Sequence, residues 1–409
     1  MLIFRIIYNV IILILLPIAV PLGYLFALKK KEEKDYFERF GFIKIENIPK
    51  KSIWFHCASV GEAKSIKILV DRIREELKDI SIVVSTVTYS GKKIAEKEIN
   101  PDISFLLPLE NSLAISYLVH LLNTKAFFIV DTELWPNLIY SVSKRCSLYL
   151  INGRISDKSF KGYYFFRFIF KNLLRRFEKI FVKSDEDFEK FSKIIGCDEN
   201  LINLGNLKFF EKKDVDTSDL SFLEGKIITA GSTHRGEEEL VLAAFESVGK
   251  YFEKLIIVPR HLNRVEEVVQ IVRDKGYSPA KWSDGDLAVR DAKVVVVDVF
   301  GILEKLYKIS EKIFIGGSVV ENIGGHNIYE ALQFEKVVAI GKNMWNFKEI
   351  YDLARKHNVV YVVEDKKQLI EYFRDDFMLP ADFDGFEREL KKSSEDKLDR
   401  ILAEIKRWV

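Results

Sequence analysis

Three carboxylates in the first half of the chain stand where short apolar runs end. Glu62 follows the run Ser52–Cys57 and opens a helical pattern, and Asp131 and Glu133 follow the run Ala126–Val130. A carboxylate within hydrogen-bonding reach of a substrate hydroxyl can take its proton as a general base. A glutamate in the first turn of a helix is also an ordinary partner of the helix dipole, which lowers its pKa unless burial opposes the effect. Both interpretations of Glu62 stay open at this point.

Two loops in the second half have the composition of anion sites. Ser232 lies in Ala-Gly-Ser-Thr-His-Arg-Gly-Glu-Glu, between an apolar run and a helical pattern. Pro259, Arg260 and His261 follow the next apolar run, where a guanidinium suits a phosphate. Free N–H groups at a helix start also favour an anion, although a simple Ser/Thr cap gives the same pattern.

A third loop combines two glycine pairs with a helix start. Gly317 and Gly325 lie in Gly-Gly-Ser-Val-Val-Glu-Asn-Ile-Gly-Gly-His-Asn, after the run Lys312–Ile315. Glycine lets backbone approach a ligand closely, so this loop has the character of a cradle for phosphate and ribose. Asn327 and Glu330 also have the spacing of a capping box, which is a purely structural interpretation.

The elements that must position these loops alternate between strand and helix. Apolar runs predict strands at Ser52–Cys57, Ser81–Thr86, Ser104–Leu107, Ala126–Val130, Ser147–Ile151, Lys179–Lys183, Lys226–Ala230, Leu255–Val258, Lys293–Val297, Lys312–Ile315, Lys336–Ile340 and Val359–Val363. Amphipathic patterns predict helices at Glu62–Leu77, Asn111–Leu122, Gly162–Arg176, Asp185–Ile195, Arg235–Gly249, Arg264–Lys275, Gly301–Lys308, Tyr329–Gln333 and Lys348–His357. Such alternation indicates an α/β protein with parallel sheets covered on both faces.

The alternation pauses at Phe210–Phe222, a polar stretch that we interpret as a linker. We therefore predict two Rossmann-like, doubly wound domains in tandem, residues 29–212 and 222–409, with a ligand cleft between the carboxyl ends of their sheets. A last helix, from about Phe386 to Trp408, could pack on either domain, and we assign it to the second.

Residues 1–28 have the character of a membrane anchor. The segment Ile6–Leu28 is apolar apart from Asn9 and is followed by three lysines, Lys29 to Lys31. Its length suffices to span a bilayer, and the positive-inside rule puts everything after it in the cytoplasm. A cleaved signal peptide would carry its charge before the apolar run, while the prolines would also permit a shallow, hairpin-like insertion. We predict an uncleaved anchor.

Composition excludes several other classes of protein. The apolar fraction of 48% and charged fraction of 30% are those of a globular protein, and a net charge of +2 gives no sign of a nucleic-acid partner. Three cysteines, Cys57, Cys146 and Cys197, have no CxxC spacing, which fits a reducing compartment and no zinc site.

The stretch Lys158–Lys183 is rich in basic and aromatic residues and contains a single acid, Glu178. Most of its aromatic residues should be core. The mixture nevertheless suits an anionic membrane surface or a phosphorylated lipid, with Arg175 and Arg176 as candidate contacts. Single-stranded nucleic acid would suit it too, but the predicted anchor argues against that partner.

Taken together, these motifs resemble the 3-deoxy-D-manno-octulosonic acid (Kdo) transferases of lipid A biosynthesis. The resemblance covers almost the whole chain and follows the order His-x-Ala-Ser-Val-Gly-Glu, Glu-x-Glu-Leu-Trp-Pro-Asn, Asn-x-Arg-x-Ser, Gly-Asn-Leu-Lys-Phe, Ser-x-His-x-Gly-Glu, Val-Pro-Arg-His and Gly-Gly-His-Asn-x-x-Glu. It implies an inverting GT-B glycosyltransferase of lipopolysaccharide biosynthesis, on the cytoplasmic side of the inner membrane of Gram-negative bacteria. Its substrates would be CMP-Kdo and the lipid A precursor lipid IVA, without a metal or other cofactor.

The resemblance also implies roles for single residues. Glu62 would be the general base, and Asp131 and Lys208 would stabilise charge in the transition state. The residues implied to hold CMP are Pro259, Arg260, His261, Phe300, Gly301, Ile302, Asn327, Ile328, Tyr329 and Glu330.

Two positions depart from the family pattern. Asp131 replaces the usual glutamate and is one methylene shorter, so Glu133 could take part of its role. Ile302 replaces a polar residue found in many members, so its contact with the ligand would be through backbone.

Two alternatives remain. One is another GT-B nucleotide-sugar enzyme, a UDP-sugar transferase or 2-epimerase; the other is a catalytically inactive membrane scaffold. An epimerase would be soluble and would have no anchor.

Overall fold

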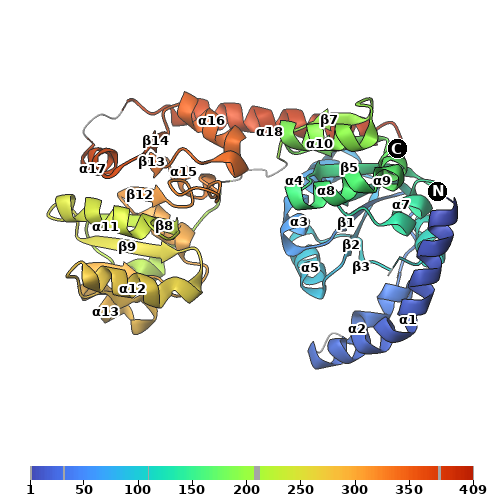
Figure 1. Cartoon of the computed structure of the whole chain (residues 1–409), viewed down its shortest axis with the longest axis horizontal. Coiled ribbons are helices and arrows are strands. Elements are labelled where there is room, and N and C mark those ends of the chain that lie inside the picture. Colours follow the sequence, from blue (N-terminus) through green and yellow to red (C-terminus); the bar gives the residue numbers. More distant parts are fainter. Residues whose placement is uncertain (1, 31–32, 109, 207–211, 376–378, 409) are drawn as a thin grey trace. The chain divides into compact units, whose positions relative to one another are not determined.

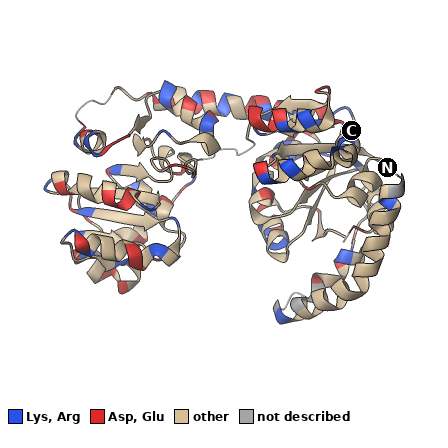
Figure 2. Ribbon diagram, viewed as in Figure 1, with Lys and Arg blue, Asp and Glu red and all other residues tan. Residues whose placement is uncertain are grey.

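Two compact units make up the chain. The computed structural model describes residues 2–30, 33–108, 110–206, 212–375 and 379–408 (Figure 1). One unit contains residues 1–209 together with 394–409, and the other contains residues 210–393. Outside the apolar segment of residues 6–28, acidic and basic residues are interspersed along both units, in keeping with the net charge of +2 (Figure 2).

The first unit is built on a parallel sheet of seven strands in the order β3-β2-β1-β4-β5-β6-β7. The strands are β1 (Ser52–Cys57), β2 (Ser81–Thr86), β3 (Ile103–Leu106), β4 (Thr124–Val130), β5 (Ser147–Gly153), β6 (Lys179–Val182) and β7 (Leu201–Asn203). Most of these residues are buried, because helices cover both faces, and this is why the strands are almost continuously apolar in sequence. The chain leaves β1 toward one edge and β4 toward the other. The carboxyl ends of β1 and β4 are therefore the switch point where such sheets bind ligands.

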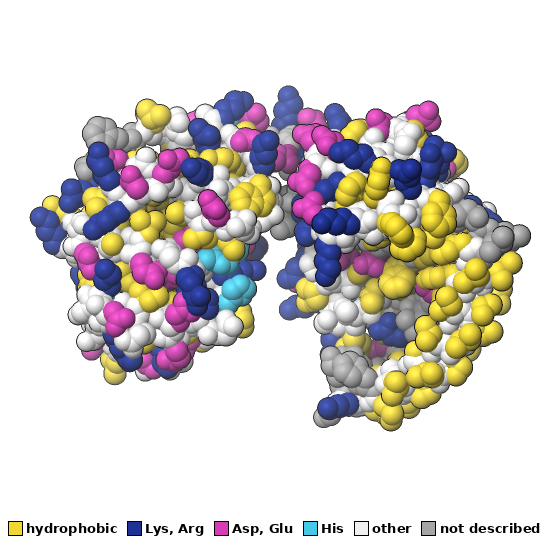
Figure 3. Space-filling model, viewed as in Figure 1, with side chains coloured by type: hydrophobic (Ala, Val, Ile, Leu, Met, Phe, Trp, Pro, Cys, Tyr) yellow, Lys and Arg dark blue, Asp and Glu magenta, His cyan; other side chains and the backbone are white. Residues whose placement is uncertain are grey.

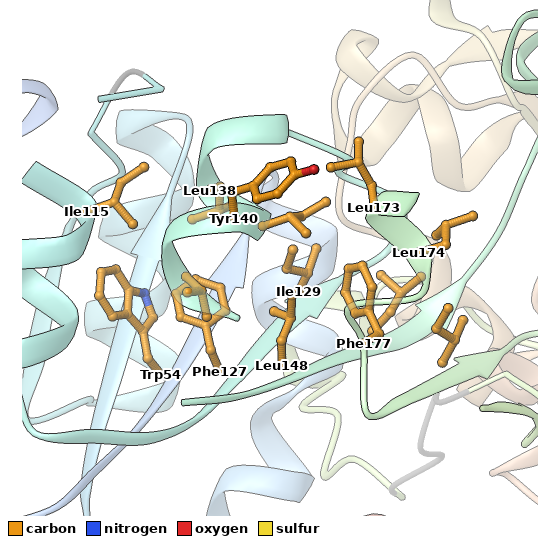
Figure 4. Close-up of a cluster of buried hydrophobic side chains, with 14 of the residues drawn as sticks. Trp54, Ile115, Phe127, Ile129, Leu138, Tyr140, Leu148, Leu173, Leu174 and Phe177 are labelled. Atoms are coloured by element: carbon orange, nitrogen blue, oxygen red, sulfur yellow. The ribbon is translucent and has the colours of Figure 1, made fainter. Parts of the chain in front are cut away.

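Helices of the first unit alternate with its strands. They are α1 (Leu2–Lys30), α2 (Glu33–Tyr36), α3 (Val60–Ser65), α4 (Lys67–Glu76), α5 (Tyr89–Ile94), α6 (Ser112–Leu121), α7 (Pro136–Val142), α8 (Asp157–Phe165), α9 (Arg167–Leu174) and α10 (Asp185–Ile195). Figure 4 shows one of its two cores, in which Trp54, Phe127 and Leu148 of the sheet meet Leu138 of α7 and Leu173 of α9. Each of these side chains is at most 1% exposed.

The last helix, α18 (Phe383–Ile405), corrects our domain assignment. Its second half belongs to the first unit, where Leu398, Ile401, Leu402 and Ile405 complete the core on the other face of the sheet. The Trp408 indole N–H donates to the Tyr149 hydroxyl at 2.7 Å. The amphipathic pattern predicted that this helix packs on a sheet, but it did not show which of the two sheets the helix covers.

The second unit has its own parallel sheet of seven strands, in the order β10-β11-β9-β8-β12-β13-β14. The strands are β8 (Ile227–Thr233), β9 (Lys254–Pro259), β10 (Ala280–Lys281), β11 (Val294–Val296), β12 (Lys312–Ile315), β13 (Val338–Ile340) and β14 (Val360–Val362). Its helices are α11 (Glu237–Val248), α12 (Val265–Asp274), α13 (Asp286–Asp291), α14 (Leu303–Ile309), α15 (Tyr329–Leu332), α16 (Lys348–Lys356) and α17 (Lys366–Arg374). Here the switch point lies between the carboxyl ends of β8 and β12.

The sequence misplaced some elements. The predicted helix Glu62–Leu77 is two helices, α3 and α4, and the predicted helix Gly162–Arg176 is divided between α8 and α9. The short strands β7 and β10 and the helix α5 were not predicted. Short edge strands carry too little periodicity to be recognised, and a bend between two helices leaves the apolar spacing almost intact.

Candidate active site

Glu62 stands at the start of α3, directly after β1. The Ser59 hydroxyl oxygen accepts the Glu62 N–H at 3.3 Å and caps the helix. In return, the Glu62 carboxylate accepts the Ser59 O–H at 2.8 Å and the Ala58 N–H at 2.5 Å. Glu62 is therefore a capping residue, and these bonds hold its half-buried carboxylate at the end of β1.

Three carboxylates gather at this switch point. Burial raises the pKa of Glu62, the bonds from Ser59 and Ala58 lower it, and the charges of Asp131 and Glu133 raise it again. Because β1 and β4 are adjacent parallel strands, the residues that follow them lie at the same edge of the sheet, and the charges of Asp131 and Glu133 act on Glu62 there. Burial opposes the helix dipole, so Glu62 keeps more affinity for a proton than an exposed glutamate.

Asp131 has a strained backbone. Its φ is 57°, in the left-handed region, and Asn152 has a φ of 59°. The Asn152 side-chain amide donates to Asp131 Oδ1 at 2.8 Å. Non-glycine residues in this region store strain that the surrounding structure must offset, and such residues cluster at functional sites.

Glu133 differs from Asp131 in its partner. The Trp135 indole N–H donates to Glu133 Oε2 at 2.5 Å. Burial, followed by the charge of Asp131, raises the Glu133 pKa. Two acidic side chains are thus present where the family has Glu-x-Glu. The third expected charge-stabilising residue, Lys208, lies outside the described residues.

Arg260 and His261 follow β9 in the second unit. They line a surface pocket of about 490 Å³ together with Leu262, Asn263 and Phe300. The Arg260 N–H donates to the Thr233 carbonyl oxygen at 3.0 Å, which ties this loop to the end of β8. Pro259 is the buried last residue of β9.

The loop before α14 contributes an exposed aromatic ring to that pocket. Phe300 is 84% exposed. Gly301 has a φ of 87°, and Ile302 is the N-cap residue of α14, without a side-chain cap bond. A flat apolar ring beside a guanidinium and an imidazole suits a ligand that has both a planar base and a negative charge.

Three histidines gather beside Arg260, an arrangement that the sequence did not predict. His234 and His326 stack with centroids 5.1 Å apart, and their Nε2 atoms are 2.8 Å apart. The His261 ring lies edge-on to His234 at 5.7 Å. Burial, then the positive charges of Arg260 and the other two histidines, lowers the pKa of His326 to about 4. Figure 3 shows histidines, in cyan, grouped on the surface of this unit.

An internal carboxylate occupies the glycine loop after β12. Glu237, fully buried, accepts the backbone N–H groups of Gly317, Ser318 and Val319 at 2.7, 3.2 and 3.1 Å, and that of His234 at 2.9 Å. We expected a ligand phosphate at such amides, but here the protein supplies the anion. A substrate phosphate beside Gly317 would need other donors. Ser232, buried with a φ of 54°, and Gly325, with a φ of 78°, are the other special backbone positions of this region.

The start of α15 differs from the predicted capping box. The N-cap residue is Ile328, one residue later than Asn327. Asn327 Oδ1 still accepts the Tyr329 N–H at 3.2 Å, and its amide donates to Glu330 Oε1 at 3.2 Å. Ile328 and Tyr329 are 0% and 4% exposed, so Asn327 and Glu330 present the accessible side chains of this group.

Arg175 and Arg176 have unlike environments. Arg175 is exposed, whereas the Arg176 guanidinium lies 3.8 Å from the centroid of the Tyr140 ring. Arg176 therefore contributes to packing as well as to surface charge. Nearby, Phe165, Phe166 and Phe168, at the junction of α8 and α9, are exposed. The expectation that most aromatic residues of this stretch are core still holds, because Phe160, Tyr163, Phe170, Phe177 and Phe181 pack in or against the cores of the first unit.

The comparison with known proteins agrees with these motifs. A family model described as 3-deoxy-D-manno-octulosonic-acid transferase (kdotransferase) matches residues 34–211. A 3-deoxy-D-manno-octulosonic acid transferase of Rickettsia bellii is 30% identical over 96% of this chain and 94% of its own length. The chain belongs to the Kdo transferase family. Its relatives in this family are glycosyltransferases, as the sequence motifs implied.

Two further matches extend the comparison. A bifunctional glycosyltransferase/methyltransferase of Fusobacterium nucleatum is 33% identical over 78% of this chain, which spans only 51% of that relative's length. A glycosyltransferase of Rickettsia africae, known from its crystal structure, has a TM-score of 0.57 at 14% identity, over 87% of this chain and 97% of its own. At that identity the likeness shows the fold alone, and it supports the GT-B prediction. Among the described residues, no group of three or more His, Cys, Asp or Glu side chains is arranged to hold a metal ion.

Proposed function

We propose that this Kdo transferase moves Kdo from CMP-Kdo to lipid IVA with inversion at the sugar. This proposal rests on three carboxylates at the switch point of the first unit, those of Glu62, Asp131 and Glu133. Glu62 takes the proton from a glucosamine hydroxyl of the acceptor. The oxygen then forms a bond to the anomeric carbon of Kdo as the bond from that carbon to the CMP phosphate oxygen breaks.

The second unit would hold the donor. The leaving CMP carries a single phosphate, which Arg260 and neighbouring N–H donors can stabilise without a divalent metal. Phe300 offers a face to the base, and Glu330 can accept hydrogen bonds from the ribose hydroxyls. Family membership and the pocket formed by Arg260, His261 and Phe300 support this assignment.

The acceptor is a lipid, which fits a location at the inner membrane with both units on the cytoplasmic side. Helix α1 is long and apolar enough to cross a bilayer by length and composition. The lysines after its apolar segment support the cytoplasmic side, because basic residues next to a membrane segment are attracted to the anionic cytoplasmic leaflet.

The decisive test is transfer by the purified full-length chain. Incubation with CMP-Kdo and lipid IVA in the presence of EDTA should increase the acceptor mass by one or more Kdo residues. The Glu62→Gln variant is the matched control. If CMP binds but no product forms either with EDTA or with added divalent metal ions, the proposed acceptor or the proposed reaction is wrong. If UDP raises the melting temperature and CMP does not, the chain is another nucleotide-sugar enzyme.

A further inference from the structure

The amino-terminal turns of α1 are attached to the first unit by polar side chains. The Tyr8 hydroxyl donates to Glu110 Oε2 at 2.8 Å. Beside it, the Asn137 side-chain amide donates to Asn9 Oδ1 at 2.7 Å. Both bonds join α1 to residues more than a hundred positions later in the chain.

The receiving residues, Glu110 and Asn137, belong to a hydrogen-bonded group at the start of α7. Glu110 accepts the N–H groups of Asn137 and Leu138 at 2.9 and 3.1 Å, and so caps α7 in place of the N-cap residue Trp135. Asn137 is fully buried, and its amide also donates to the Glu110 carbonyl oxygen at 2.8 Å. If α1 moved away from this position, Glu110 and Asn137 could keep their bonds to it only by leaving the folded unit.

The other end of α1 is also attached to this unit. The Tyr36 hydroxyl donates to the Val20 carbonyl oxygen of α1 at 2.6 Å. On either side of Tyr36, Asp35 and Glu38 bind the Lys92 ammonium of α5 at 2.9 and 2.6 Å. Glu38 also accepts the Leu106 N–H of β3 at 2.8 Å.

A bilayer-crossing α1 is incompatible with these two attachments. The two attachments meet α1 at Tyr8 and at Val20, which at a rise of 1.5 Å per residue are roughly 18 Å apart along the helix, less than the thickness of the hydrocarbon core of a bilayer. A crossing α1 would therefore place at least one attachment, together with the part of the folded unit that supplies it, inside the hydrocarbon core. The buried Asn137 amide would also lose its partner Asn9, which the lipid cannot replace.

We propose that α1 lies along the membrane surface, parallel to the bilayer plane, and does not cross it. The lipid bilayer covers the exposed apolar surface of α1. Between Ile6 and Leu28, Asn9 is the one exposed polar residue among the described side chains of α1, and the exposed large apolar side chains are those of Ile6, Ile7, Val10, Ile11, Leu13, Ile14, Leu15, Ile18, Leu22, Leu25 and Leu28 (Figure 3). The proposal rests on the membrane location given under the proposed function, but not on the transfer reaction.

A second lipid-compatible surface adjoins the amino-terminal end of α1. The Tyr140 ring lies between two guanidinium groups, Arg5 of α1 at 4.3 Å and Arg176 after α9 at 3.8 Å. From there, α9 leads back to the exposed rings of Phe165 and Phe168, which are 76% and 64% exposed. Exposed cations flank these rings at Lys161, Arg167 and Arg175. Aromatic rings with flanking cations suit the headgroup region of an anionic bilayer.

The proposal is tested by the side of the membrane on which the two ends of the chain lie. Short uncharged epitopes at each end of the full-length protein are tested for cleavage by protease added to intact spheroplasts and, separately, after lysis. A helix in the membrane plane keeps both epitopes on one side, so both are cut only after lysis. Cleavage of the amino-terminal epitope alone in intact spheroplasts would overturn the proposal.

Photo-crosslinking in the same membranes tests the contacts themselves. Benzoylphenylalanine in place of Tyr8 should give an internal adduct within residues 110–140, whereas the same group in place of Leu13, which is 69% exposed, should give a lipid adduct. An adduct between two chains at position 13 would make a second copy the occupant and overturn the proposal. Because neither assay measures transfer, a failure here leaves the transferase assignment standing.

Discussion

The Asn152 side-chain amide donates a hydrogen bond of 2.8 Å to Asp131, and both residues have left-handed backbone conformations. Asp131 follows β4 and Asn152 is the second-last residue of the adjacent strand β5, so the bond joins two neighbouring strand ends. Asp131 in turn acts on Glu62 through its charge. Asn152 therefore holds Asp131, the residue that replaces the family's longer glutamate, and the charge of Asp131 acts on the proposed general base, Glu62.

We expect Asp131→Asn to move the acid limb of the pH profile to lower pH. A base works only when ionised, and a raised pKa means that activity is lost at a higher pH as the solution is acidified. Removing the Asp131 charge lowers the Glu62 pKa, while burial, the largest cause of its elevation, stays in place. The measurement is kcat against pH, with Lys125→Ala, an exposed change in β4, as control. An unmoved limb would mean that Glu62 does not set it.

The Glu62→Gln variant should lower kcat by a factor on the order of 10²–10⁴ and leave CMP affinity unchanged. Glutamine cannot take a proton, although it still offers one oxygen to Ala58 or Ser59. A purely capping role predicts instead a small loss of melting temperature and a nearly normal rate, because one neutral hydrogen bond contributes about 0.5–1.5 kcal/mol. Steady-state kinetics, calorimetry with CMP and thermal melting of the same sample separate these outcomes.

Arg260→Ala should weaken CMP binding about tenfold or more. The variant removes a charge-assisted bond to phosphate of roughly 1.5–3 kcal/mol. Arg290→Ala is the matched control, because this exposed arginine precedes the amino end of β11 at the opposite edge of the sheet. Titration calorimetry with CMP is the measurement. Equal affinities in the two variants would exclude the Arg260 pocket as the nucleotide site.

Glu330→Ala should also weaken CMP binding, through loss of the acceptor for the ribose hydroxyls. Because Asn327 donates to Glu330, the comparison is made with Asn327→Ala, which breaks the same internal bond but keeps the carboxylate. Glu330→Ala should lose affinity for CMP and retain it for inorganic phosphate. Unchanged CMP affinity in Glu330→Ala would remove Glu330 from the nucleotide site.

Charge reversal at Arg175 should raise the KM for lipid IVA and weaken liposome binding without a change in CMP affinity. Arg175→Glu changes an exposed side chain, whereas Arg176→Glu also removes the contact with Tyr140. We therefore expect a fall in melting temperature only for Arg176→Glu. Wild-type lipid binding in Arg175→Glu would make this residue part of an ordinary solvated face.

Leu402→Ala should destabilise the first unit by about 2–5 kcal/mol, although residue 402 follows the second unit in sequence. Its side chain is 1% exposed and packs in the core that contains Val84 and Phe128. Arg400→Ala, an exposed neighbour on the same helix, is the control. Denaturant unfolding is monitored through Trp54, which lies in the first unit. If the two variants have the same free energy of unfolding, α18 does not stabilise this core.

The amino-acid sequence alone determined the class of fold and the positions of the candidate sites. Apolar runs separated by amphipathic patterns gave most of the strands and helices, because buried parallel strands are apolar throughout and helices repeat with a fixed period. The loops with Glu62, Asp131 and Arg260 were found because each follows such a run, and the carboxyl ends of parallel strands share one edge of a sheet. Family motifs then supplied the expected chemistry.

Only the tertiary structure decided how residues distant in sequence meet. His234 and His326 are 92 positions apart, and their contact depends on the adjacency of β8 and β12. The Glu237 carboxylate binds the glycine loop that we expected to bind phosphate, because the start of α11 faces that loop. Glu110, which no motif marked, caps α7 and binds α1. Periodicity specifies which face of an element is buried, but the partner of that face depends on strand order and on contacts between remote segments, and these have no local signature in the sequence.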